Sequence, residues 1–94
     1  MVKRIVWTKP ALEDKLEILI YFNKRNKSNV YSKKLNQIFK ETIKLVRDQP
    51  SLARETENPR VKYILTRDYL IFLRLHSPKS LLCIYGIQEE TLVN

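Results

Sequence analysis

The sequence predicts a single α+β domain over residues 1–94, with the element order β-α-α-β-β-β and an antiparallel helical hairpin packed on one face of an antiparallel sheet. Two observations predict this class. Apolar residues recur every three or four positions from Leu12 to Val46, as in amphipathic helices, and then alternate with a period of two from Val61 to Ile87, as in strands. The length and the 44% hydrophobic content suit one folded domain with a modest core.

The chain is expected to begin with a strand followed by a helix. Residues 2–7 are rich in β-branched side chains, and they should join the sheet because nothing else would cover them. Thr8 can cap the helix that follows, and Pro10 suits its first turn, where the missing N–H costs little. The expected buried stripe of this helix consists of Leu12, Leu16, Leu19 and Ile20.

A second helix is expected after the short polar segment of residues 25–29, and it should run to about Asp48, because Pro50 stops it. Its expected apolar stripe consists of Tyr31, Leu35, Ile38, Phe39, Thr42, Leu45 and Val46. Because the break between the helices is short, they should pack as an antiparallel hairpin.

Three strand-like runs follow a polar loop at residues 50–59, and they cover residues 61–66, 69–76 and 80–87. The links between them, at residues 67–68 and 77–79, are short enough for antiparallel hairpins. The middle run is apolar on both faces, which indicates a central strand with one face under the helices.

One pair of side chains on this middle run could do acid–base chemistry. If the all-apolar alternate positions face the helices, Arg74 and His76 emerge together on the open face. A histidine can act as base or acid, and arginine can bind a phosphate, as cleavage of RNA by its own 2′-OH requires. The alternative is that His76 is an ordinary exposed histidine with no catalytic role. Further candidates are Arg60, Lys62 and Arg67 as phosphate-binding cations, Tyr85 as a catalytic or base-stacking group, and Glu89 with Glu90 as general bases if the tail folds back over the sheet.

The net charge of +8 is concentrated in the first half of the chain, with 12 basic and 5 acidic residues up to Pro50, against 6 and 5 after it. The basic residues of the expected hairpin are Lys24, Arg25, Lys27, Lys33, Lys34, Lys40, Lys44 and Arg47, opposed only by Glu41. They form either a solvated helix face or a surface that meets nucleic acid or an acidic protein.

Composition excludes several classes of site. The single glycine, Gly86, cannot build a glycine-rich phosphate loop, and Cys83 with His76 cannot complete a zinc site. One cysteine forms no intramolecular disulfide, and no apolar run approaches the roughly 20 residues of a membrane span. We therefore expect a cytoplasmic protein with no metal, no small-molecule cofactor and no membrane partner.

Several stretches, in their order, resemble the RelE/ParE superfamily of toxins from type II toxin–antitoxin modules, also called the plasmid stabilisation protein family. They are IVWTKPALEDKLEILIYF, NVYSKKLNQIFKETIKLV, DQPSLARETENPRVKYIL and RDYLIFLRL, within a likeness that covers residues 2–87. The resemblance implies a growth-arresting toxin that an acidic antitoxin neutralises. Members that cleave messenger RNA on the ribosome usually carry arginine, with tyrosine or histidine, near the last strand. Here IYGIQEETLVN keeps Tyr85 but has Gln88 where the basic residue would stand, and Leu70 follows Tyr69 where that branch has another basic residue.

Three functions stay open on the sequence, and with them whether the protein is an enzyme. The first is a toxin that binds an essential target such as DNA gyrase, and the missing C-terminal arginine favours it over the second. The second is an mRNA endonuclease that uses Arg74 and His76 with Glu89 or Tyr85, and the third is an inactivated toxin or a basic nucleic-acid-binding module. The expected contacts to target or nucleic acid are Lys24, Arg25, Lys27, Lys33, Lys34, Arg60, Lys62 and Arg67.

Overall fold

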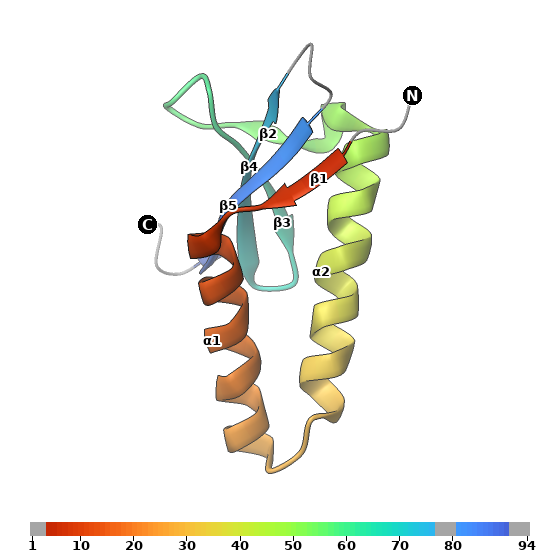
Figure 1. The fold of residues 1–94 in the computed structure, drawn as a ribbon, viewed down its shortest axis with the longest axis vertical. Coiled ribbons are helices and arrows are strands. Elements are labelled where there is room, and N and C mark those ends of the chain that lie inside the picture. The colour runs from red at the N-terminus through yellow and green to blue at the C-terminus, as the bar shows by residue number, and fades with distance from the viewer. Residues whose placement is uncertain (1–3, 77–80, 91–94) are drawn as a thin grey trace.

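The computed structural model describes residues 4–76 and 81–90, so the predicted link at residues 77–79 and the first two residues of the predicted N-terminal strand lie outside the described residues. The elements are β1 (Arg4–Trp7), α1 (Lys9–Asn26), α2 (Val30–Asp48), the 3₁₀ turn η1 (Pro50–Leu52), β2 (Arg54–Glu55), β3 (Lys62–Thr66), β4 (Tyr69–His76) and β5 (Leu81–Glu89). They form a five-stranded sheet with the helical hairpin beside it (Figure 1), which confirms the predicted α+β class and element order.

The sheet has the strand order β1-β5-β4-β3-β2, and β4 is its central strand as predicted. It is mixed rather than wholly antiparallel, because β1 pairs in parallel with β5 from Arg4 opposite Leu81 to Trp7 opposite Ile84. The other pairings are antiparallel. A second difference lies in the loop predicted at residues 50–59, where β2 adds two residues to the edge of β3.

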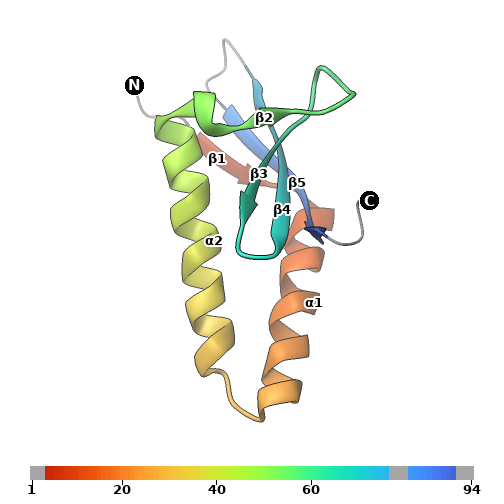
Figure 2. The same ribbon diagram turned by 180° about the vertical axis from the view of Figure 1, so that it is seen from behind.

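The two helices turn back on each other through residues 27–29, as the short polar break predicts. The hydroxyl of Thr8 accepts a hydrogen bond from the Ala11 N–H at 3.4 Å, which confirms the predicted cap of α1. Lys27 ends α1 in the left-handed region, at φ 53°, and its N–H bonds to the Asn23 carbonyl. Seen from both sides, the hairpin extends well beyond the sheet, so its closed end has no strand beside it (Figure 2).

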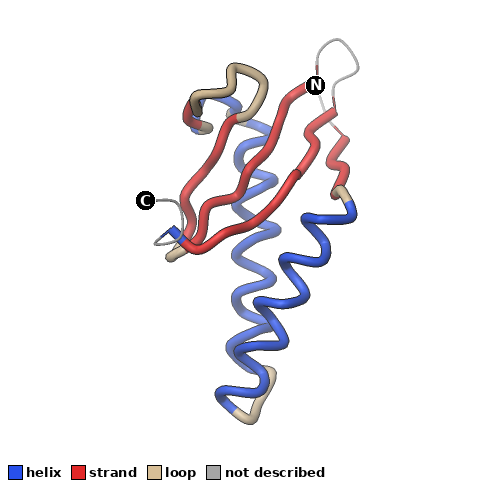
Figure 3. The backbone as a smooth tube through the Cα atoms, turned by 90° about the vertical axis from the view of Figure 1, so that its left-hand side faces the viewer, coloured by secondary structure: helices blue, strands red, loops and turns tan. Residues whose placement is uncertain are grey.

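The core lies between α2, the inner side of α1 and one face of the sheet (Figure 3). From α2 it takes Leu35, Phe39, Ile43 and Val46, and from the sheet Tyr69, Ile71, Leu73, Leu82, Ile84 and Ile87. The predicted stripe of α2 is therefore right for Leu35, Phe39 and Val46, whereas Tyr31 and Leu45 are exposed.

The predicted stripe of α1 is wrong for three of its four residues, because Leu12, Leu16 and Ile20 are exposed and only Leu19 packs against the core. The cause is a set of polar contacts that orients the helix. The Asp14 carboxylate accepts the Ile87 N–H of β5 at 3.0 Å. Thr8 also bonds to β5, since its hydroxyl and its N–H both donate to the Ile84 carbonyl, at 2.8 and 3.0 Å. These contacts fix the rotation of α1 about its axis, and the face that then meets the core carries Ala11, Ile18, Leu19 and Phe22. Neither long helix of the described residues could cross a membrane.

Candidate functional site on the open face of the sheet

The face of β4 that points away from the helices carries the predicted Arg74 and His76. Their alternate neighbours Ile71 and Leu73 are fully buried against the helices, whereas Arg74 and His76 are half-buried. The face of β4 that carries Arg74 and His76 is therefore the open one, as predicted. The predicted pair therefore lies on the solvent side of the sheet.

The structure adds Tyr85 to this pair. The Tyr85 hydroxyl lies 3.2 Å from Nε2 of His76, on the neighbouring strand. Arg74 stands opposite Cys83 in the pairing of β4 with β5, and His76 stands opposite Leu81, so the arginine lies between the histidine and the tyrosine along the strand direction. A phenol, an imidazole and a guanidinium thus share one patch, which could hold a phosphate and transfer a proton.

A bulge in β5 positions Tyr85. Ile84 pairs with Leu73 and Gly86 pairs with Phe72, so Tyr85 is the extra residue. A Cβ on Gly86 would lie 3.0 Å from Oδ2 of Asp14, the same oxygen that accepts the Ile87 N–H. The only glycine of the chain therefore lets the Asp14 carboxylate approach the strand at the bulge.

The structure does not bring Glu89 to this patch. Glu89 pairs with Tyr69, whereas His76 pairs with Leu81 at the other end of the same two strands. The two ends of β4 are seven positions apart, which corresponds to roughly 24 Å. The sequence pattern could not exclude this contact, because it did not show that β5 continues through Glu89.

The other predicted cations are also dispersed. Lys62 lies opposite Leu73 and lines a small crevice on the helix side of the sheet with Val46 and Leu82, so it is on the wrong face to assist Arg74. Arg67 occupies the β3–β4 turn, at the end of the sheet distant from His76. Arg60 lies in the loop before β3, where its N–H bonds to Oδ1 of Asn58 at 2.9 Å.

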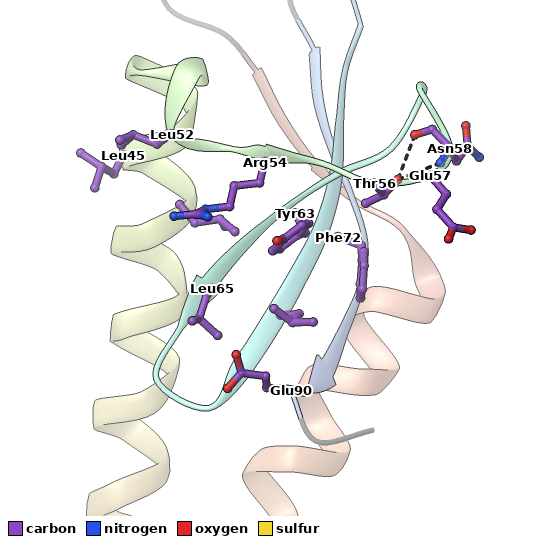
Figure 4. A pocket seen from close by; sticks show the side chains of 12 residues that line it. Leu45, Leu52, Arg54, Thr56, Glu57, Asn58, Tyr63, Leu65, Phe72 and Glu90 are labelled. Carbon is purple, nitrogen blue, oxygen red and sulfur yellow. Dashed lines mark hydrogen bonds between the residues drawn. The ribbon is translucent and has the colours of Figure 1, made fainter. Parts of the chain in front are cut away.

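A broad groove of about 1060 Å³ runs from the open face of the sheet past the β2–β3 edge to Leu45 of α2 and Leu52 of η1 (Figure 4). Its apolar lining includes Tyr63 and Phe72, whose rings lie 6.4 Å apart, with Leu65 and Leu70 beside them. Its charged lining residues are Arg54, Glu57 and Glu90, so the groove is not basic. The sequence analysis missed this groove because β2, which places Arg54 beside Tyr63 at the edge of the sheet, was not predicted.

A second hollow, of about 540 Å³, lies between α1 and the end of β5, and it is lined by Asp14, Glu17, Glu89 and Tyr69. Tyr69 packs edge-to-face on Phe39 at 5.6 Å between ring centroids. Burial, followed by the nearby charge of Glu89, raises the pKa of Tyr69 to about 12. The acidic lining makes this hollow a poor site for an anion.

The basic residues predicted for target contact divide into two groups in space. Lys24, Arg25, Lys27, Lys33 and Lys34 are all exposed around the closed end of the hairpin, away from the sheet. Arg60 lies in the loop before β3, Lys62 at the start of β3 and Arg67 in the β3–β4 turn, so these three are separated. Within residues 4–76 and 81–90, the hairpin is therefore where these cations are concentrated.

Among known proteins, no family model matches the chain and no curated protein is similar to it. Solved structures do match its fold. A chain of the chromosomal ParDE TA system from P. aeruginosa has 18% sequence identity and a TM-score of 0.74, over 94% of this chain and 96% of that chain. A chain of the toxin–antitoxin complex RelBE2 from Mycobacterium tuberculosis has 9% identity and a TM-score of 0.61, over 95% and 99%.

A third structure, of a mutant E. coli toxin RelE in complex with an antitoxin RelBc peptide, has 14% identity and a TM-score of 0.55, over 99% of this chain and 90% of that chain. The three matches cover nearly the whole of each chain. The chain thus has the fold of the RelE/ParE toxins, as the resemblance predicted.

Proposed function

We propose that this protein is the toxin of a type II toxin–antitoxin module, acting in the cytoplasm and neutralised by an acidic antitoxin. The observation that carries the proposal is the match of the whole chain to three toxin–antitoxin structures. Induction of the gene alone should arrest growth, and co-expression of the adjoining acidic reading frame should restore it. A frame-shifted gene is the control, and unaffected growth on induction would contradict the proposal.

For the mechanism, we propose that the toxin binds an essential target such as DNA gyrase rather than cleaving RNA. Support comes from the charge distribution, because five exposed cations lie around the closed end of the hairpin, whereas the groove of the sheet carries two carboxylates and one arginine. The purified protein should inhibit supercoiling by gyrase. Replacement of Lys24 and Arg25 by glutamate should weaken the inhibition. Replacement of Arg60 and Arg67 by glutamate, in two loops of the sheet, makes the same change of net charge and serves as the matched control. Normal supercoiling with excess protein would exclude gyrase as the target.

A second candidate, ribosome-dependent mRNA cleavage, is favoured by the contact between His76 and Tyr85 beside Arg74. If this patch is catalytic, His76→Ala and Arg74→Ala should each abolish cleavage of messenger RNA in cells. Tyr85→Phe should lower it by at least about tenfold, as loss of a proton-transfer group does. Glu89→Gln, at the far end of the strands, should retain activity. Full toxicity in both His76→Ala and Arg74→Ala would remove the mechanism.

If growth is unaffected by induction, the third function remains, an inactivated toxin or a basic nucleic-acid-binding module. Binding of duplex and single-stranded nucleic acid by the purified protein, at two salt concentrations, then decides between these two possibilities.

A further inference from the structure

The bulge of β5 begins where the pairing of β5 with β1 stops. The last pair between these two strands is Trp7 with Ile84, and β5 continues to Glu89. From Tyr85 onward, no described strand pairs with that edge of β5, because the chain leaves the sheet at Thr8 and enters α1. Backbone groups on this part of the edge therefore need partners other than a strand.

Two polar side chains at the start of α1 supply these partners. The hydroxyl of Thr8 donates to the Ile84 carbonyl at 2.8 Å and also lies 3.5 Å from the Tyr85 carbonyl oxygen. The Asp14 carboxylate accepts the Ile87 N–H at 3.0 Å. These two contacts lie on either side of Tyr85 along the strand. The N-terminal half of α1 thus holds the backbone of the bulge at both ends.

The bulge is also required by the apolar pattern of β5. Ile84 and Ile87 both belong to the core, at 0% and 3% exposure, although they are three positions apart. In a regular strand, residues three apart point to opposite faces, so one of the two would leave the core. The extra residue, Tyr85, lets both isoleucines face the helices, while its own hydroxyl reaches Nε2 of His76 at 3.2 Å.

The contact between Tyr85 and His76 is sensitive to the position of the bulge. A separation of 3.2 Å lies at the long end of the hydrogen-bond range, so a displacement of about 1 Å would break the contact. Gly86, the next residue along β5, leaves room for the Asp14 carboxylate, since a Cβ there would lie 3.0 Å from its Oδ2. The carboxylate is thus packed against the backbone beside Tyr85, and neither can move without the other.

We propose that Asp14 is a positioning residue for the open-face patch, because it holds the bulge of β5 so that the Tyr85 hydroxyl stays within hydrogen-bond distance of His76. Thr8 holds the other end of the same bulge. The consequence for chemistry rests on the second candidate function, mRNA cleavage, whereas the geometry does not. The inference adds to that candidate a residue of the helical hairpin that acts through the strand.

Two simpler roles for Asp14 make different predictions. If the carboxylate acts only through its negative charge, every variant without that charge should behave alike. If it only stabilises the fold, the contact between Tyr85 and His76 should persist in every molecule that is folded. Asp14→Asn keeps an oxygen that accepts the Ile87 N–H and loses the charge, whereas Asp14→Ala loses both, so this pair of variants separates the three roles.

The test follows the contact in the native protein by NMR. His76 is the only histidine of the chain, so its ring protons give a single set of signals. The wild type should show a nuclear Overhauser effect (NOE) between the rings of Tyr85 and His76. Asp14→Ala should abolish this NOE, and Asp14→Asn should retain it. The NOE between Phe39 and Tyr69, whose rings pack at 5.6 Å in the core, should persist in both variants and shows that they are folded.

A second variant approaches the same contact from the strand, in case Asp14→Ala does not fold. In Gly86→Ala the new Cβ would displace the carboxylate, so the NOE between Tyr85 and His76 should weaken. Glu13→Ala removes the neighbouring, exposed carboxylate of α1 and should leave the NOE unchanged.

Three outcomes would overturn the inference. The first is an unchanged NOE in both Asp14→Ala and Gly86→Ala. The second is an equal loss in Asp14→Asn and Asp14→Ala, which would assign the effect to charge. The third is a loss in Glu13→Ala, which would mean that the contact responds to any change in this part of α1.

Cleavage of messenger RNA in cells tests the consequence for chemistry. Asp14→Ala should lower cleavage by at least about tenfold, as Tyr85→Phe does, and the double variant should lose no more, because one residue acts through the other. Asp14→Asn should retain cleavage. Full cleavage by an Asp14→Ala variant that has lost the NOE would overturn the positioning role. A wild type that cleaves no RNA would refute the candidate function, and the NMR test of the geometry would still stand.

Discussion

The two helices contact the rest of the molecule in different ways. α2 buries a row of apolar side chains, with Phe39 and Ile43 almost completely inaccessible. α1 also packs apolar side chains on the core, but its contact with β5 includes two polar anchors. The Thr8 hydroxyl donates to the Ile84 carbonyl at 2.8 Å, and the Asp14 carboxylate accepts the Ile87 N–H at 3.0 Å. An apolar stripe in the sequence therefore identifies the buried side of a helix when apolar packing alone sets the rotation of that helix. It can mislead when polar contacts help to set that rotation.

The largest expected effect tests this comparison with one substitution in each helix. Phe39→Ala should lower the free energy of unfolding by about 3–5 kcal/mol, because it leaves a cavity in the core. Leu16→Ala should lower it by less than about 0.5 kcal/mol, because the side chain is already exposed. Urea unfolding of both variants measures the contrast. Similar losses would mean that Leu16 contributes to the packing of α1 as much as Phe39 does to that of α2.

A smaller loss is expected where α1 meets the bulge of β5. Asp14→Ala should cost about 1–3 kcal/mol, because it leaves the Ile87 N–H without its acceptor. Glu13→Ala, at the exposed neighbouring position, is the control and should change stability by less than about 0.5 kcal/mol.

Gly86→Ala should also lower stability, because the new Cβ would lie 3.0 Å from Oδ2 of the Asp14 carboxylate. Its cost should therefore shrink in the Asp14→Ala background, and thermal unfolding of the double mutant measures that coupling. If the stability losses of Gly86→Ala and Asp14→Ala add exactly, the Asp14 carboxylate does not require the absence of a Cβ at position 86.

Charge reversal on α2 should raise the free energy of unfolding rather than lower it, and by a smaller amount. Lys40→Glu replaces repulsion of Lys15 by attraction and should raise the free energy of unfolding by about 0.2–0.5 kcal/mol at low salt. Lys34→Glu changes the net charge equally, so it controls for general relief of the positive charge. The charge of Lys40 is, after burial, the second cause that lowers the pKa of Lys15. The gain should fade as salt screens the pair, and a Lys40→Glu variant no more stable than Lys34→Glu would argue against this electrostatic interaction.

The smallest expected effect is the dependence of stability on the ionisation of Tyr69, which arises at alkaline pH and not near neutrality. The pKa of Tyr69 is about 12 in the folded protein and about 10 in an unfolded chain. Between these values the unfolded state binds fewer protons, so the free energy of unfolding should fall as pH rises from about 10 to about 12.

Tyr69→Phe should reduce this alkaline loss, and ultraviolet titration of the native protein should lose its latest tyrosine step. Tyr21→Phe, at an exposed position of α1, is the control. An unchanged pH profile in Tyr69→Phe would show that the buried phenol is not the cause.

Much of the fold could be predicted because it is encoded over short distances. Thr8 with Pro10 marks the start of α1, and alternation marks the eight residues of β4. The same alternation predicted that Arg74 and His76 share the open face. The contact of His76 with Tyr85 could not be predicted, because it depends on the bulge that shifts the register between two strands.

The sequence alone determined the element order, the central strand and the concentration of positive charge on the hairpin, since each follows from periodicity or composition along the chain. Only the tertiary structure decided that β1 runs parallel to β5, that β2 extends the sheet, and that Leu12, Leu16 and Ile20 face outward. The physical reason is common to all three. Pairing partners and the rotation of a helix are set by contacts between residues distant in sequence, here above all by one carboxylate of α1 that reaches the backbone of β5.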